Sequence, residues 1–138
     1  ADGCHLPQSL LKLIYKEKGA AHIALITDSM RAAGQDVTES ILGGKDGGLP
    51  VIVEDGVAKL LDRSAFAGSI ATADVLIRTL TKECDVPVAT AVKMLTKVPA
   101  EILQVNKGEL KAGRDADVVV FDEDINIQQV FLAGKTVL

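Results

Sequence analysis

The stretch that decides the fold is Ala24-Leu25-Ile26-Thr27-Asp28-Ser29-Met30-Arg31-Ala32-Ala33-Gly34. A short apolar run ends at Thr27 and Asp28, and a loop of small residues follows it. A run of this length is long enough for a buried strand and too short for a helix. Because α/β enzymes carry their chemistry at the C-terminal ends of strands, the pattern makes Asp28 a candidate site carboxylate.

The composition bounds the kind of protein. With 138 residues, of which 48% are hydrophobic, the chain can form one core, built mainly from Val, Ile, Leu and Ala. A net charge of −4 argues against nucleic acid or an anionic membrane as partner, and no apolar run is long enough to span a membrane. Cys4 and Cys84 are expected to be reduced thiols, which favours a cytoplasmic location.

The first residues suggest a chain that begins inside an element. Residues 1–5 resemble the end of a strand entering a loop, as in a fragment or a trimmed product. The apolar spacing of residues 8–18 predicts a helix that stops at Gly19. Residues 21–27 are then predicted to be a buried strand. This order of elements predicts one right-handed β-α-β step of a parallel sheet.

Residues 32–49 are predicted to be a long loop, because Gly, Ser, Thr, Asp and Gln dominate them. A hairpin is predicted next, with its strands at 51–53 and 57–61 and its turn at Asp55-Gly56. Further elements expected from the apolar periodicity are a helix from Ser69 or Thr72 to about Glu83, a helix from Pro87 and a short helix from Pro99 carrying Ile102 and Leu103.

The end of the chain changes its periodicity. Residues 118–121 form a continuous apolar run, and near-alternation follows with a slip at Gln128-Gln129, where a bulge is expected. A turn at Ala133-Gly134 leads into the last residues. The pattern predicts a small antiparallel sheet beside the α/β part.

Four motifs give the chain a family likeness. It resembles the C-terminal part of the N-acetylglucosamine-6-phosphate deacetylases, which are members of the amidohydrolase superfamily. The likeness covers essentially the whole chain. The motifs are Ala1-Asp2-Gly3-Cys4-His5 with Pro7, Thr27-Asp28-Ser29-Met30 through Ala33-Gly34, Phe66-Ala67-Gly68-Ser69, and Gly108-Glu109-Leu110 through Gly113-Arg114-Asp115-Ala116-Asp117-Val118-Val119-Val120-Phe121-Asp122.

The resemblance implies an α/β fold that is only part of a larger one. Residues 1–105 would be the C-terminal part of a (β/α)8 TIM barrel, with its last strands and helices. Residues 106–138 would be the C-terminal share of a small β-sandwich. A full barrel needs about 250 residues. The family's metal-binding Glu and two His would therefore lie upstream, and neither His5 nor His22 occupies their positions.

By the same resemblance, Asp28 is the catalytic base and acid of amide hydrolysis, and it lies near enough to contact the metal or its water. The intact parent would hold a divalent zinc or iron ion. The isolated chain would bind no metal and would be inactive. The alternative for Asp28 is a purely structural one, in which its carboxylate caps the following loop through the N–H groups of Ser29 or Met30.

Two further segments would contact the amino sugar. By resemblance, Asp2, Gly3, Cys4 and His5 lie at the barrel mouth, where a neutral His5 could also orient the acetyl oxygen. The residues that would line the sugar pocket are Phe66, Ala67 and Gly68. The alternatives are a loop-capping role for His5 and an ordinary helix N-terminal turn at 66–69. His22 is interpreted as structural, and Arg31 and Arg63 as solvated charges.

The expected partner is a small amino-sugar phosphate, with no nucleic acid and no membrane. A partial barrel exposes sheet edges, so we expect a homo-oligomer or association with a complementary chain. The alternative to an enzyme segment is a non-catalytic folded or partnering module derived from an amidohydrolase.

Overall fold

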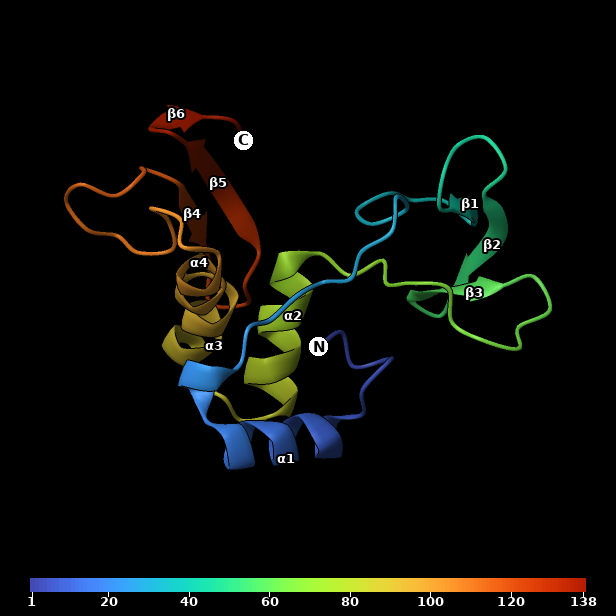
Figure 1. The fold of residues 1–138 in the computed structure, drawn as a ribbon, viewed down its shortest axis with the longest axis horizontal. Helices are drawn as coiled ribbons and strands as arrows, with labels where there is room; N and C mark the ends of the chain where they lie inside the picture. Colours follow the sequence, from blue (N-terminus) through green and yellow to red (C-terminus); the bar gives the residue numbers. More distant parts are fainter.

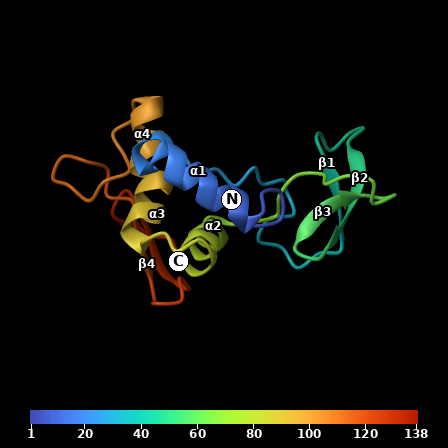
Figure 2. The same ribbon diagram turned by 90° about the horizontal axis from the view of Figure 1, so that it is seen from below.

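Two small antiparallel sheets lie well apart in the structure: the one formed early in the chain stands away from the helices, and the C-terminal one lies at the same end as the last two helices (Figure 1). A second view at right angles shows the same separation (Figure 2). This computed structural model describes residues 1–138. Its elements in chain order are α1 Gln8–Lys18, η1 Ala20–His22, β1 Glu39–Leu42, β2 Leu49–Glu54, β3 Val57–Leu60, α2 Ala73–Arg78, η2 Thr79–Glu83, α3 Val88–Leu95, α4 Lys97–Leu103, β4 Val118–Phe121, β5 Ile127–Leu132 and β6 Lys135–Thr136.

Helix α1 confirms the first predicted helix at both ends. Gly19 stops it with a φ of 73°, and its N–H donates to the carbonyl of Tyr15 at 3.0 Å. A positive φ at this position favours glycine, because side chains with a Cβ are strained there. Leu11 is the buried residue of α1, which therefore rests on the core through one narrow face.

The strand predicted at residues 21–27 is wrong. Residues 20–22 form the short 3-10 helix η1, which includes His22, and residues 23–28 have no regular structure. Leu25 is buried and donates its N–H to the carbonyl of Met94 at 2.9 Å, whereas Ile26 is 67% exposed. A strand needs a paired neighbour, and no strand of either sheet pairs with this segment.

The predicted β-α-β step of a parallel sheet is wrong for the same reason. Both sheets are antiparallel, and residues 1–5 form no strand. The parallel pairing that remains is a single bridge between Ser29 and Ser69.

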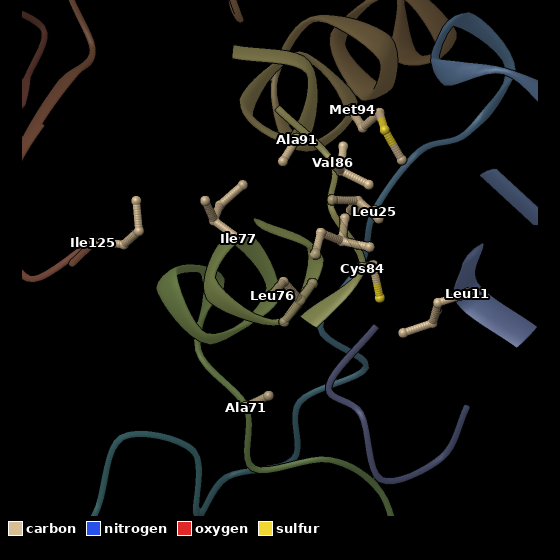
Figure 3. Packing of buried hydrophobic residues seen from close by; sticks show 11 residues of the cluster. Leu11, Leu25, Ala71, Leu76, Ile77, Cys84, Val86, Ala91, Met94 and Ile125 are labelled. Carbon is tan, nitrogen blue, oxygen red and sulfur yellow. The ribbon is translucent and has the colours of Figure 1, made fainter. Parts of the chain in front are cut away.

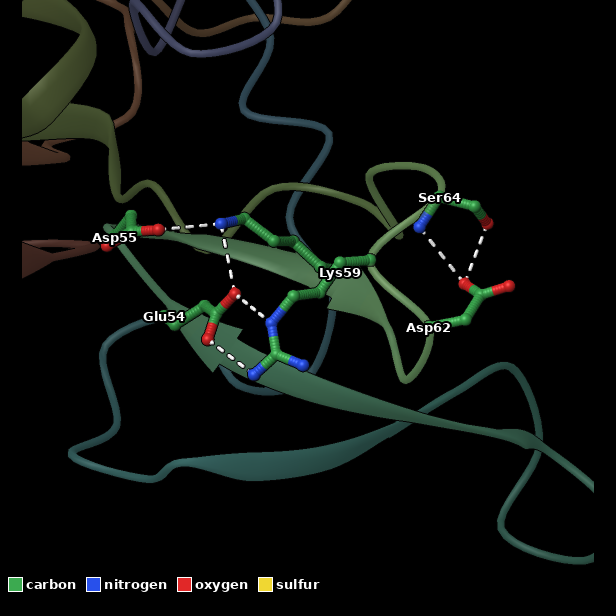
Figure 4. A network of polar contacts seen from close by, with 6 residues as sticks. Glu54, Asp55, Lys59, Asp62 and Ser64 are labelled. Carbon is green, nitrogen blue, oxygen red and sulfur yellow. Dashed lines mark hydrogen bonds and ion pairs between the residues drawn. The ribbon is translucent and has the colours of Figure 1, made fainter.

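The first sheet has the order β1-β2-β3. The predicted hairpin is confirmed, with positive φ angles at Asp55 and Gly56 that suit a tight two-residue turn. The predicted loop at 32–49 is wrong in part, because it contains β1, which pairs with β2. Glu54 accepts hydrogen bonds from Lys59 and Arg63 beside this turn (Figure 4).

The helices enclose the main core of eleven buried residues, five of which come from α2, η2 and α3 (Figure 3). The predicted helix ending at Glu83 is present, although its last turn widens into the π-helix η2. Helix α4 begins at Lys97 rather than at Pro99. Proline is tolerated there because the first turn of a helix needs no N–H donor from it.

The second sheet has the order β4-β5-β6 and confirms the predicted antiparallel tail. Val120 pairs with Gln129 and Phe121 with Ile127, so Gln128 is the extra residue of a bulge. Positive φ angles at Ala133 and Gly134 form the turn into β6.

Much of the chain's surface is exposed. Its accessible area is 8713 Å², whereas a compact monomer of this mass exposes about 6,900 Å². Large apolar side chains such as Ile26 and Leu110 are exposed on it. Both cysteines are free. None of the helices is long and apolar enough to cross a membrane.

Candidate functional site

Asp28 lies where the segment after Leu25 meets the segment after Gly68. The Ser69 N–H donates to the Asp28 carbonyl at 3.1 Å, and the Met30 N–H donates to the Ser69 carbonyl at 2.8 Å. Asp28 has a φ of 53°, a conformation that aspartate tolerates better than most residues. The two backbones therefore fix the position of Asp28, although neither is part of a regular strand.

The Asp28 carboxylate is exposed and makes no hydrogen bond within the chain. The Met30 N–H, one of the two groups that the Asp28 carboxylate could cap, donates to the Ser69 carbonyl instead. The structural alternative for Asp28, a cap on its own loop, is therefore not what the structure shows. The carboxylate remains available to an external group.

An open cavity of about 470 Å³ adjoins Asp28. Gly68 lines it with a φ of +89°, and a Cβ there would lie 3.4 Å from the Met30 Cβ. Glycine thus allows the backbone to lie close to Met30 at the wall of the cavity. The other lining residues are Ser29, Met30, Arg31, Ile41, Leu42 and Gly43.

Two serine hydroxyls and one arginine hold this cavity in shape. The Ser29 hydroxyl donates to the Ala71 carbonyl, and the Ser69 hydroxyl accepts the Ala71 N–H at 3.0 Å. The Arg31 guanidinium donates to the Gly43 carbonyl next to β1, and the residue stays exposed to solvent, as predicted for a loop charge. These contacts fix the loop after Asp28 against the sheet.

The sequence did not indicate that residues 41–43 line this cavity. They lie in the segment predicted as loop, and β1 brings them over Asp28. The available signal was the apolar pair Ile41-Leu42 directly before Gly43-Gly44, which is typical of a short strand entering a turn.

A second group of predicted residues forms a tight turn at the N-terminus. Asp2 Oδ1 accepts the N–H groups of Cys4 and His5, both at 3.1 Å, and Asp2 Oδ2 lies 2.7 Å from His5 Nδ1. Gly3 permits the turn with a φ of +80°. Asp2 therefore caps this loop, and the His5 ring is held by Asp2.

The segment 66–68 connects the two groups. The Phe66 and His5 rings lie 5.0 Å apart between centroids at 60°. Ala67 is buried against Val51 and Ala58 of the first sheet, and Gly68 lines the Asp28 cavity. Phe66 therefore belongs with His5, and Gly68 with Asp28.

The titratable groups of the N-terminal turn have shifted pKa values. Burial alone would raise the pKa of Asp2, but hydrogen bonds from His5 and Cys4 outweigh it, and the pKa of Asp2 is lowered. Burial, with the nearby Asp2 and Glu83 carboxylates, raises the pKa of the Cys4 thiol. Cys4 is therefore a protonated thiol near neutral pH rather than a reactive thiolate.

The chain's own side chains do not fit a complete metal site. Nowhere do three or more His, Cys, Asp or Glu side chains gather in a group that could hold an ion. Asp28 is the one such residue lining its cavity. Divalent metal sites in proteins generally draw on three or more such ligands, so these 138 residues do not supply the set by themselves.

Comparison with known proteins adds three findings. The profile of the amidohydrolase family matches residues 1–137. N-acetylglucosamine-6-phosphate deacetylase from Lysinibacillus sphaericus is 36% identical over 97% of this chain and 34% of its own length. The solved N-acetyl-D-glucosamine-6-phosphate deacetylase from Mycobacterium smegmatis is 32% identical, with a TM-score of 0.88, over 99% of this chain and 36% of that one.

A shorter relative is known in Escherichia coli K12. This putative N-acetylgalactosamine-6-phosphate deacetylase is 32% identical, and the alignment covers 98% of this chain and 78% of the relative. By contrast, the chain spans about a third of the length of the Lysinibacillus and Mycobacterium proteins.

Proposed function

The chain belongs to the amidohydrolase family, and from this we propose that it is the C-terminal portion of a deacetylase that releases acetate from N-acetylglucosamine 6-phosphate. Relatives with that name match nearly the whole chain. The observation that carries the proposal is the exposed, unpaired carboxylate of Asp28 beside a cavity lined by Gly68.

In the proposed reaction, Asp28 accepts a proton from the attacking water and later passes it to the leaving amine. A positioned carboxylate can do both, and such proton transfers contribute roughly 10²- to 10⁴-fold to a rate. Phe66 and His5 would border the sugar, and the backbone of Ala67 and Gly68 would pass close to it. An amino-sugar phosphate is the proposed small-molecule partner.

Amidohydrolases generally depend on divalent metals. We propose that zinc or iron serves the intact parent and that residues outside this chain hold it, with Asp28 near the ion or its water. The segment 1–105 would then complete a TIM barrel, and 106–138 a small β-sandwich. The free thiols of Cys4 and Cys84 support a cytoplasmic location.

In the intact parent, Asp28→Asn should lower kcat by roughly 10²- to 10⁴-fold while sugar binding stays largely intact, because the amide keeps its size but cannot take a proton. Asp36→Asn is the matched control, since Asp36 is an exposed loop residue that does not line the cavity. Acetate release at varied substrate concentration measures both parameters. Wild-type turnover in Asp28→Asn would refute the assignment.

The isolated 138-residue chain should release no acetate, because its own side chains do not make up a metal site. The measurement is acetate release with zinc or iron added, using the 6-phosphates of both N-acetylglucosamine and N-acetylgalactosamine. Deacetylation under these conditions would contradict the expected inactivity.

A second candidate is a non-catalytic partnering module derived from an amidohydrolase. The extended surface of the chain and the existence of a short relative in E. coli K12 favour it. The two proposals are compatible, since a parent enzyme can also give rise to an inactive piece.

A further inference from the structure

The contact between Asp2 and His5 restricts what His5 can do. The Asp2 side chain is only 7% exposed, and both of its oxygens are in use. One oxygen accepts two backbone N–H groups, and the other lies 2.7 Å from His5 Nδ1. The carboxylate is therefore held in one orientation by the same turn that carries the imidazole.

An ionised carboxylate has no proton to donate, so the hydrogen of this contact must sit on His5 Nδ1. Asp2 is ionised at neutral pH, because its hydrogen bonds lower its pKa despite burial. In a neutral imidazole that carries hydrogen on Nδ1, the Nε2 atom has a lone pair and can only accept.

The other ring nitrogen of His5 faces no competing group of the chain. No residue bonds to Nε2, and the His5 side chain is 32% exposed. Phe66 packs against the ring at 5.0 Å between centroids and limits its rotation. The nitrogen that Asp2 leaves free is thus the one offered to a ligand.

We propose that Asp2 is a positioning residue that holds His5 in the tautomer with hydrogen on Nδ1, so that Nε2 accepts a hydrogen bond from a hydroxyl or amide N–H of the substrate. The identity of that substrate as an amino sugar rests on the proposed function. In this tautomer a neutral His5 has no hydrogen on Nε2, so it cannot donate a hydrogen bond to the acetyl oxygen. Orienting the acetyl oxygen is the role that the family resemblance suggests for His5.

The test is ¹⁵N NMR of the histidine rings in the 138-residue chain, which contains only two histidines. At about pH 8.5 histidine side chains are ordinarily neutral, and the ¹⁵N shift separates a protonated ring nitrogen from one with a lone pair. We expect His5 with hydrogen on Nδ1 and a lone pair on Nε2. His22 is an internal control, because its Nδ1 faces the Lys18 carbonyl at 3.1 Å and must also carry hydrogen.

Asp2→Asn should reverse the tautomer of His5 and leave that of His22 unchanged. The Asn oxygen can keep the two backbone N–H bonds, which turns its NH2 group toward His5 Nδ1 and moves the ring hydrogen to Nε2. Hydrogen on Nε2 in the wild-type chain would overturn the proposal. An unchanged His5 spectrum in Asp2→Asn would also overturn it, provided that a dispersed amide spectrum shows the variant to be folded. The wild-type spectrum decides the point even if Asp2→Asn does not fold.

Titration with N-acetylglucosamine 6-phosphate separates this inference from the proposed function. Nε2 should stay unprotonated and shift in the direction of an accepted hydrogen bond; protonation of Nε2 on binding would overturn the inference. A spectrum that does not change with sugar would count against the proposed sugar contact of His5, while the tautomer of the free chain would stand.

Discussion

At the scale of single residues, carboxylates organise the turns on which the structure depends. Asp2 caps the N-terminal turn, and Asp122 does the same at the turn between β4 and β5. Asp122 accepts the N–H groups of Asp124 and Asn126 at 3.0 and 2.9 Å, and the side chain of Asn126 at 2.9 Å. Hydrogen bonds from the Asn126 side chain and backbone lower the pKa of Asp122 below its ordinary 3.8.

The Asp122 turn should therefore make stability depend on pH. A lowered carboxyl pKa stabilises the fold fully above the ordinary value of 3.8, and this stabilisation disappears as pH falls through the folded-state pKa. Asp122→Ala should lower the Tm at pH 7, and by a smaller amount near pH 3, below the ordinary pKa of 3.8. Thermal unfolding at both pH values measures this.

The matched control for Asp122 is Glu123→Ala, because the Glu123 side chain makes no hydrogen bond in the chain. It should leave the Tm almost unchanged at both pH values. An equal loss of Tm for Asp122→Ala at pH 7 and pH 3 would contradict a role for the ionised carboxylate.

At the scale of elements, a close backbone contact holds the loop after α4 against the junction of α3 and α4. Gly108 follows α4 and has a φ of +82°. A Cβ there would lie 2.6 Å from the Thr96 carbonyl oxygen and 3.0 Å from the Ala100 Cβ. Gly113 has nearly the same φ, +85°, but nothing lies within 4 Å of its Cβ position. Both glycines have a left-handed backbone conformation, but only at Gly108 would an added Cβ also clash with neighbouring atoms.

Alanine substitutions at these two glycines separate the cost of backbone strain from the cost of steric crowding. Gly113→Ala should reduce the free energy of unfolding by about 1–2 kcal/mol, the cost of a side chain in the left-handed region. Gly108→Ala should cost about 1–3 kcal/mol more, because the added methyl group meets the backbone at the junction of α3 and α4. Urea denaturation measures both values. Equal losses for the two variants would show that the Gly108 contact relaxes without cost.

At the scale of the whole molecule, the chain exposes more surface to solvent than a compact monomer of the same mass. The accessible area exceeds that of a compact monomer by roughly 1,800 Å². A stable interface takes about 800 Å² from each partner. Residues 23–28 also lack strand partners, and Ile26 is 67% exposed among them. We propose that a second copy or a complementary chain covers this region.

The purified chain should therefore associate in a concentration-dependent way, as measured by light scattering. Ile26→Glu should lower the apparent mass, because a charge on an apolar interface opposes burial. Leu110→Glu is the control, since Leu110 is 80% exposed but lies in the loop between α4 and β4. A wild-type monomer that unfolds cooperatively would contradict the expected association.

The sequence by itself determined the elements that satisfy their hydrogen bonds locally. Helix α1 ends at Gly19, the hairpin turns at Asp55-Gly56, and the bulge in β5 falls at Gln128, all as predicted. Each depends on periodicity or on backbone angles that particular residues favour, and these act over a few positions. The family likeness was also readable, because its motifs are short and local.

Only the tertiary structure decided whether an apolar run becomes a strand and which residues share a site. The run ending at Thr27 has the composition of a strand, yet it stays unpaired because pairing needs a neighbour from elsewhere in the fold. Gly68 lies beside Asp28, and Phe66 packs on His5, although each pair is far apart in sequence. Such contacts depend on the packing of distant segments, which local residue preferences do not encode.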